Sequence, residues 1–220
     1  MSAQFFNLRG WCCLMLALFI AGCVAPPPPP DYTNFRAHRP RSILVLPPLN
    51  QSTTVEATYG YLSTVTFPLA EMGYYVFPVA VVDQFLKENG MPTAGEMHQI
   101  PLAKVHEIMG ADAVLYTTLV EYGTRYQVLN SKTEVNVKGK LVDTRTGITL
   151  WEGMGVARQD SSGSGNIIAD LVAAAVTQVL NSSTDTAHEV SRSANANLLQ
   201  LKGRGILYGP YHPEYEKEKP

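Results

Sequence analysis

The side chains that most often bind metals or act as general bases are spread thinly along this sequence. Its five histidines are His38, His98, His106, His188 and His212. His98 and His106 are separated by a segment that contains Pro101, and no H-E-x-x-H spacing occurs in the chain. Because metal sites need several ligands at close spacing, the sequence predicts no metal and no cofactor. His106 and the adjacent Glu107 are interpreted as a solvated helix face.

Phosphate chemistry has one weak candidate, the segment 161–166, which reads Ser-Ser-Gly-Ser-Gly-Asn and precedes an apolar helical pattern. Backbone amides at the start of a helix can hold a phosphate. The segment lacks the lysine of a Walker A loop, however, and no G-x-S-x-G nucleophile elbow is present. We interpret it as a strand-to-helix loop with Asn166 as the N-cap.

The remaining carboxylates also have structural interpretations. Asp143 opens a turn, Asp160 ends a strand, and Asp170 lies in the first turn of a helix. No catalytic residue is assigned, so the sequence predicts a protein that is not an enzyme. The alternative is a protein that binds a small molecule or glycan, with the loop 161–166 bounding a concave pocket.

The three cysteines are confined to the amino-terminal part of the chain, at Cys12, Cys13 and Cys23. This distribution excludes a disulfide scaffold, a thiolate zinc site and an iron–sulfur cluster from the folded body. Residues 1–22 have the parts of an export signal, because Arg9 precedes an apolar run over 11–20. As a helix that run spans only about 15 Å, half the thickness of a bilayer core.

The signal ends in Ile20-Ala21-Gly22-Cys23, which resembles a bacterial lipobox. We therefore expect cleavage between Gly22 and Cys23 and diacylglycerol on the Cys23 thiol, which would anchor the protein to a membrane through lipid. Val24 follows, and no aspartate occupies the next two mature positions. Under the sorting rule of bacterial lipoproteins, this predicts an outer-membrane lipoprotein whose domain faces the periplasm.

The residues after the anchor predict a linker followed by one folded domain. The linker covers 23–41 and includes the proline run 26–30, which favours an extended polyproline II spacer. The chain has 220 residues and is 45% hydrophobic, which is enough for a real core in a domain over 42–202. Its 17 basic and 19 acidic residues argue against a nucleic-acid binder.

Apolar periodicity and turn residues divide this domain into alternating strands and helices. The predicted strands cover 42–46, 74–77, 113–120, 127–142 and 148–158, and the predicted helices cover 55–72, 79–89, 101–109, 167–179 and 186–201. The turn 143–147 predicts a hairpin, and Gly153 and Gly155 predict a bulge or a close-packing position in its second strand. The tail 203–220 is expected to be extended or loosely docked. Its aromatic residues Tyr208, Tyr211 and Tyr215 are candidates for protein interaction.

Two segments carry a resemblance to known envelope proteins. Gly110-Ala111-Asp112 enters an aliphatic strand, and the sequence LVDTRTG over 141–147 leads to Leu150-Trp151. In these segments the chain resembles CsgG-type lipoproteins and the amino-terminal domain of TolB, and as a whole it is similar to a family of bacterial lipoproteins of unknown function. The resemblance implies an α/β fold, with a mixed β-sheet packed with helices. It also implies a role as an interaction or assembly module in the cell envelope, with a CsgG-like lipoprotein as partner or by self-association.

Overall fold

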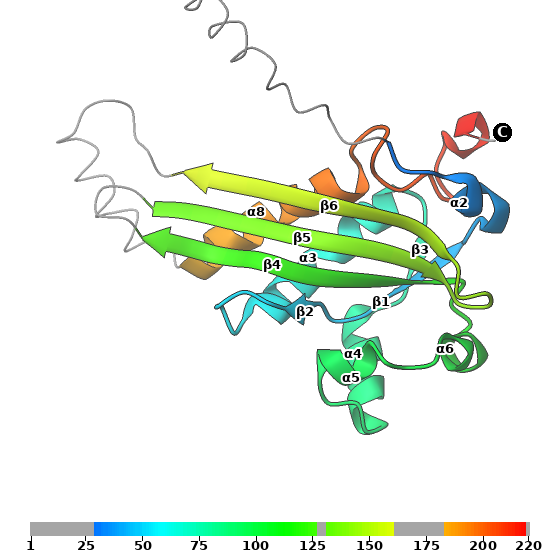
Figure 1. Ribbon diagram of the computed structural model, residues 1–220, viewed down its shortest axis with the longest axis horizontal. Helices are drawn as coiled ribbons and strands as arrows, with labels where there is room; N and C mark the ends of the chain where they lie inside the picture. The colour runs from blue at the N-terminus through cyan, green and yellow to red at the C-terminus, as the bar shows by residue number, and fades with distance from the viewer. Residues whose placement is uncertain (1–28, 127–130, 161–182, 219–220) are drawn as a thin grey trace, which may run out of the picture.

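A computed structural model describes residues 29–126, 131–160 and 183–218. Its sheet has the strand order β3-β1-β4-β5-β6, and β2 also pairs with β4 (Figure 1). The strands are β1 (Ser42–Val45), β2 (Leu49–Asn50), β3 (Tyr75–Val76), β4 (Ala113–Tyr126), β5 (Ser131–Asp143) and β6 (Thr149–Asp160). β1 is parallel to β3 and β4, whereas β4, β5 and β6 form an antiparallel meander. The predicted mixed sheet packed with helices is confirmed.

Helices cover both faces of the sheet around β1, which explains its unbroken aliphatic sequence. The helices are α2 (Thr33–His38), α3 (Ala57–Glu71), α4 (Val79–Glu88), α5 (Ala94–Met97), α6 (Leu102–Met109) and α8 (Ser183–Leu199), with a short 3₁₀ helix η1 (Tyr215–Glu218). Ile43 and Val45 point into the main core beneath α3 and α8. Leu44 and Leu46 point into a smaller core formed with α4, α5 and α6.

The meander is longer than the sequence predicted. β4 continues past Val120 to Tyr126, and the described part of β5 begins at Ser131. Residues 127–130, where the predicted strand 127–142 starts, lie outside the described part of the chain. The register shifts between Leu119 and Glu121. Beyond that bulge only one face of β4 is buried, by Tyr122. The extension therefore lacks the continuous apolar run that marks the first half of the strand.

The turn between β5 and β6 forms as expected because Asp143 organises it. The Asp143 carboxylate accepts hydrogen bonds from the backbone N–H groups of Arg145 (3.0 Å) and Thr146 (2.8 Å), and from the Thr146 hydroxyl. Gly147 has a φ of +71°, a conformation that glycine adopts at no steric cost. The predicted hairpin and the assignment of Asp143 as its turn opener are confirmed.

α8 packs very closely on β6, at the glycines singled out in the sequence. A Cβ atom at Gly155 would overlap the Ala194 carbonyl oxygen and the Leu198 side chain, and one at Gly153 would overlap the Trp151 ring. These are the close-packing positions that the sequence predicted. α8 corresponds to the helix expected over 186–201, whereas the predicted helix 167–179 and the loop 161–166 lie outside the described residues.

A buried chain of hydrogen bonds joins α3 to α8 inside the main core. The Tyr61 hydroxyl donates to Asn195 Oδ1 (2.5 Å), and Asn195 Nδ2 donates to Thr64 Oγ1 (2.8 Å). All three side chains are buried. Burial also raises the pKa of Tyr61, so its hydroxyl remains a donor throughout the physiological range. The pairing satisfies polar groups that would otherwise be costly to bury.

The structure places a helix where the sequence predicted the end of a linker. α2 spans Thr33–His38, and its Phe35 side chain is only 3% exposed, in the main core. The Tyr32 hydroxyl donates to the Gly205 carbonyl oxygen (2.6 Å). The polar and basic character of residues 31–41 hid this helix, because it buries one large side chain rather than a periodic stripe. The fold therefore begins before residue 42.

The carboxyl-terminal tail is docked on the domain by backbone contacts. Gly209 N–H donates to the Met72 carbonyl (2.7 Å), Tyr211 N–H donates to the Gly73 carbonyl (3.1 Å), and Ile206 is buried. Trp151 Nε1 donates to the Arg204 carbonyl (2.9 Å). The tail and α2 therefore close the same end of the sheet, as Figure 1 shows.

We predict that Asn195→Ala lowers the free energy of unfolding by about 2–3 kcal/mol, because it leaves the buried Tyr61 hydroxyl without its acceptor. Tyr61→Phe is expected to cost less, and the two substitutions together should cost clearly less than the sum of their separate effects. Chemical denaturation of the four proteins of this double-mutant cycle measures the coupling. Strictly additive losses would contradict the network.

Candidate interaction surfaces

The histidines serve the fold rather than a common centre. His98 Nε2 contacts the Pro47 carbonyl oxygen (2.8 Å), and His106 Nδ1 contacts that of Ala111 (3.1 Å). Burial lowers the pKa of His98 although the bond to Pro47 opposes that shift. His106 is therefore not the solvated residue that the sequence suggested. Within the described residues no cluster of three His, Cys, Asp or Glu side chains could hold a metal ion.

The two segments that carry the CsgG and TolB resemblance meet at the carboxylate of Asp112. That carboxylate accepts hydrogen bonds from the backbone N–H groups of Arg41 (3.0 Å) and Ser42 (3.2 Å) and forms a 2.5 Å ion pair with Arg145. Burial opposes ionisation, but the Arg41 amide, the Arg145 guanidinium and Ser42 together lower the pKa of Asp112. Asp112 thus connects the start of β4 to β1 and to the β5–β6 turn, so its role in these two segments is to stabilise the fold.

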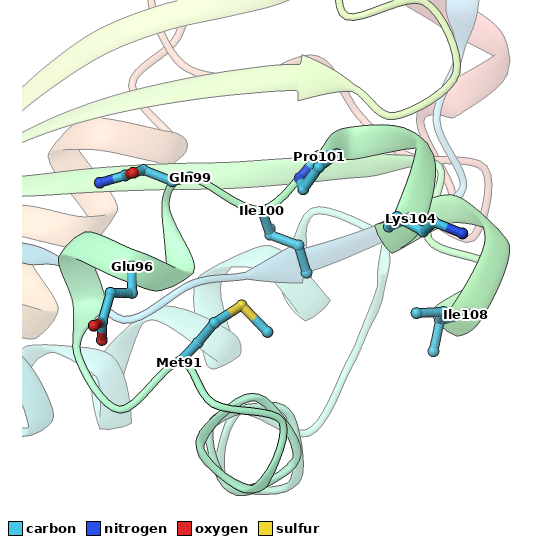
Figure 2. A pocket seen from close by; sticks show the side chains of 7 residues that line it. All are labelled: Met91, Glu96, Gln99, Ile100, Pro101, Lys104 and Ile108. Atoms are coloured by element: carbon cyan, nitrogen blue, oxygen red, sulfur yellow. The ribbon is translucent and has the colours of Figure 1, made fainter.

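A shallow hollow of about 400 Å³ lies beside α5 and α6 (Figure 2). Met91, Ile100 and Ile108 supply its apolar lining, and Figure 2 shows Met91 and Ile100 directed toward each other. Its two charged side chains are engaged elsewhere, because Glu96 caps α5 through Thr93 and Lys104 pairs with Glu107 (2.7 Å). The lining thus offers few polar groups free to orient a ligand. The pocket expected for the ligand-binding alternative, bounded by the loop 161–166, falls outside the described residues.

The three tyrosines proposed for interaction differ in accessibility. Tyr211 is 69% exposed and lies at the docked tail, whereas Tyr208 is half-buried and stacks on His212 with ring centres 3.7 Å apart. Tyr215 is half-buried in the first turn of η1. Of the three, only Tyr211 presents most of its side chain to a partner. The others take part in local packing of the tail.

Comparison with known proteins identifies the family. The family model described as "Putative lipoprotein GNA1162-like" matches residues 30–211, which include nearly all the described structure. The chain belongs to the GNA1162-like family. A relative named "Putative lipoprotein NMB1124/NMB1162", from Neisseria meningitidis serogroup B (strain ATCC BAA-335 / MC58), is 46% identical over 200 residues. That match covers 90% of this chain and 93% of the relative.

The GNA1162-like fold is also similar to a solved structure. The crystal structure of lipoprotein GNA1162 from Neisseria meningitidis is 49% identical and matches with a TM-score of 0.53. The match covers 65% of this chain and all of that one. The names of these matches describe lipoproteins and carry no CsgG or TolB designation. The coarser expectation, membership of a bacterial lipoprotein family, is confirmed.

The anchor itself lies outside the described structure. Gly22 and Cys23 belong to the segment 1–28, of which nothing structural is said. Among the residues that the structure describes, no helix has the length and apolar character needed to span a bilayer. Sequence reasoning missed the ion pair of Asp112 with Arg145, because it arises only from strand pairing.

Removal of the Asp112 charge gives a pH-dependent prediction. Asp112→Asn should lower the free energy of unfolding by about 1–2 kcal/mol at neutral pH, since it loses charge-assisted hydrogen bonds. A carboxyl whose folded pKa is lowered stabilises the fold above its unfolded pKa, about 3.9, and loses that contribution as pH falls through the folded value. The difference between wild type and variant should therefore shrink below about pH 4. A pH-independent difference in chemical denaturation would contradict this assignment.

Proposed function

We propose that this protein is a non-enzymatic lipoprotein of the cell envelope, anchored through Cys23 to the outer membrane, that acts as a periplasmic interaction module. One observation carries the proposal: Cys23, the last residue of the sequence Ile20-Ala21-Gly22-Cys23, stands only ten positions before Thr33, where the first helix of the described residues begins. Family membership supports the lipoprotein assignment. Two or three acyl chains on one cysteine hold a protein far more firmly than one.

The short tether would fix which end of the domain lies near the bilayer. Residues 24–32 separate Cys23 from α2, and a fully extended chain of that length reaches about 30 Å at most. The end closed by α2 and the docked tail, which includes Tyr211, would therefore remain close to the lipid surface. The opposite end of the β4–β5–β6 meander would extend into the periplasm, where partners are accessible.

The partner is proposed to be either a CsgG-type lipoprotein or a second copy of this chain. The CsgG-type candidate is supported by the resemblance of residues 110–115 and 141–151 alone. Since Asp112 and Arg145 in those segments hold strands together within this chain, the resemblance supports a shared fold more directly than a shared binding surface. The partner therefore has to be identified by experiment.

Anchoring is tested by Cys23→Ser. We expect the wild-type chain to sediment with outer membranes and to incorporate labelled palmitate, and the variant to lose both properties because it lacks the thiol that accepts lipid. Fractionation of membranes on a density gradient, with immunodetection, measures the shift. A variant that remains in the outer-membrane fraction and labelled would contradict the assignment of Cys23.

The interaction role is tested by affinity purification of the tagged wild-type chain from detergent-solubilised envelopes. We expect a stoichiometric protein partner, identified by mass spectrometry, that is recovered at lower yield with Cys23→Ser because co-localisation on the membrane raises the effective concentration. Tyr211→Ala serves as a probe of the tail surface. Recovery of a lone monomer would contradict the role as an interaction module.

A further inference from the structure

Three arginines lie together at the end of the domain nearest the proposed anchor. Arg36 belongs to α2, Arg39 is the C-cap of that helix, and Arg41 directly precedes β1. All three are exposed, and within the described residues none of them forms an ion pair with a carboxylate. Asp31 is the only acidic residue among residues 1–55. We refer to these three arginines as the basic end.

The basic end has a fixed backbone, although the sequence predicted a linker here. Phe35 holds α2 in the main core, and the Arg39 N–H closes the helix by donating to the Phe35 carbonyl (2.9 Å). The Arg41 N–H donates to the Asp112 carboxylate (3.0 Å), and the Arg41 carbonyl accepts from the Tyr75 N–H (3.0 Å). A charged surface that binds these arginines therefore does not have to order the chain first.

The carboxylates beside the basic end have other partners. Asp112, which accepts the Arg41 N–H, forms its ion pair with Arg145. Asp31 accepts hydrogen bonds from the backbone N–H (2.9 Å) and the hydroxyl (2.7 Å) of Thr33 at the start of α2. The three guanidinium groups of the basic end thus keep their charge available to a partner outside the chain.

Charge is distributed unevenly between this end and the rest of the domain. Residues 29–41 and 202–218, which form α2, its flanks and the docked tail, contain 6 basic and 4 acidic residues. Residues 42–201 contain 9 basic and 15 acidic residues. The positive excess therefore coincides with the end where α2 and the tail lie together (Figure 1). A negatively charged surface would attract this end and repel the remainder, which would orient the domain.

Exposed apolar and aromatic side chains occur around the basic end. Tyr75, whose N–H bonds to the Arg41 carbonyl, is 53% exposed, and Tyr211 of the docked tail is also exposed. Ile148 is exposed in the β5–β6 turn, and β6 begins there under a hydrogen bond from Asn34 of α2. Tyrosine is enriched at the level of the lipid headgroups in membrane proteins. Arginines flanked by such side chains suit a bilayer surface.

We propose that the basic end binds the phospholipid headgroups of the membrane that holds the anchor, so that the domain lies against an anionic bilayer surface. This inference rests on the proposed anchoring through Cys23. A guanidinium group matches the geometry of phosphate oxygens, and its charge is permanent. Residues 24–32 can reach only about 30 Å when fully extended, so the anchor would keep the basic end within reach of headgroups.

The expected effect follows from the charge of each arginine. One basic side chain close to an anionic membrane strengthens binding about fivefold. Removal of all three should therefore shift the equilibrium between docked and undocked domain by up to about a hundredfold. Salt should weaken docking, because the Debye length falls from about 10 Å at 0.1 M to about 3 Å at 1 M ionic strength.

The test uses the full lipidated chain, purified from membranes and reconstituted into vesicles through its anchor. In the proposed mature chain the single cysteine carries the lipid, so Ala37→Cys provides one free thiol on α2 for an environment-sensitive fluorophore. We expect its emission to shift to shorter wavelength in vesicles that contain phosphatidylglycerol, relative to vesicles of phosphatidylcholine alone. The same label at Arg125→Cys, near the end of β4, is the position control and should not shift.

Charge variants test the basic end directly. Arg36→Gln, Arg39→Gln and Arg41→Gln combined should lower the docked-to-undocked ratio at least about tenfold. Lys132→Gln, Lys138→Gln and Lys140→Gln combined, all on β5, cause the same change in net charge and should leave the ratio within about threefold. The three corresponding Arg→Lys substitutions should retain docking, because attraction to a lipid surface depends on charge. Circular dichroism checks that each variant is folded.

Several outcomes would overturn the docking. These are the absence of a shift in anionic vesicles, a shift that survives loss of the three arginines, and loss of docking in the Arg→Lys variant. Inorganic phosphate should release the domain no better than sodium chloride of equal ionic strength, and selective release would indicate a phosphate site instead of a lipid surface. If the Arg→Gln variant docks normally but loses a protein partner in affinity purification, the basic end serves that partner.

Mass spectrometry of the purified chain separates this inference from the proposed function. A chain that carries no lipid on Cys23 would contradict the proposed anchoring. A lipidated chain whose α2 label does not respond to anionic vesicles would contradict the docking alone, and the proposed function would stand.

Discussion

The close contact of α8 with the sheet is the constraint on which the rest of the fold depends. It requires glycine at 155, because any side chain there would meet the backbone of α8, and it requires Asn195 to satisfy polar groups from α3. Gly139 of β5 is a second glycine beneath α8, where it packs against the Leu198 side chain and the Trp151 ring. With so little side-chain volume between them, helix and strands are held at short range, and dispersion contacts across that gap are correspondingly many.

The sequence could predict the elements whose apolar pattern has a single interpretation. The aliphatic run at 43–46 is buried on two faces, and the sequence predicts it correctly as a strand. The Asp143 turn is also predicted correctly, because the Asp143 side chain bonds to groups within the turn itself. The sequence did not predict α2, because a helix of six residues that buries only one phenylalanine shows no hydrophobic periodicity. The sequence also did not predict the second half of β4, because the strand contains fewer apolar residues where one of its faces is exposed to solvent.

The candidate surfaces depend on relations between distant residues, which explains why the sequence did not reveal them. Asp112 and Arg145 lie 33 positions apart and meet only because β4 and β5 pair in one register. Likewise, among the described residues β6 is the outermost strand of the sheet because β5 is the strand that pairs with it. Local patterns identify a strand and its faces, but neighbour order is a global property. The tyrosines of the tail could be named as candidates, whereas their unequal exposure required the docked conformation.

The joining of α2 to the docked tail has a mechanical consequence. If Cys23 carries the proposed lipid anchor, a force between membrane and domain would enter the fold near Thr33 and would first be resisted by Phe35 in the core and by the hydrogen bond from Tyr32 to Gly205. These contacts lie at the edge of the domain and would break one after another under force. The strands of the sheet are held by many hydrogen bonds that would share the force. Tension would peel α2 from the domain before the sheet yields. With the proposed anchor, unfolding of α2 would lengthen the tether under load while the sheet remains folded.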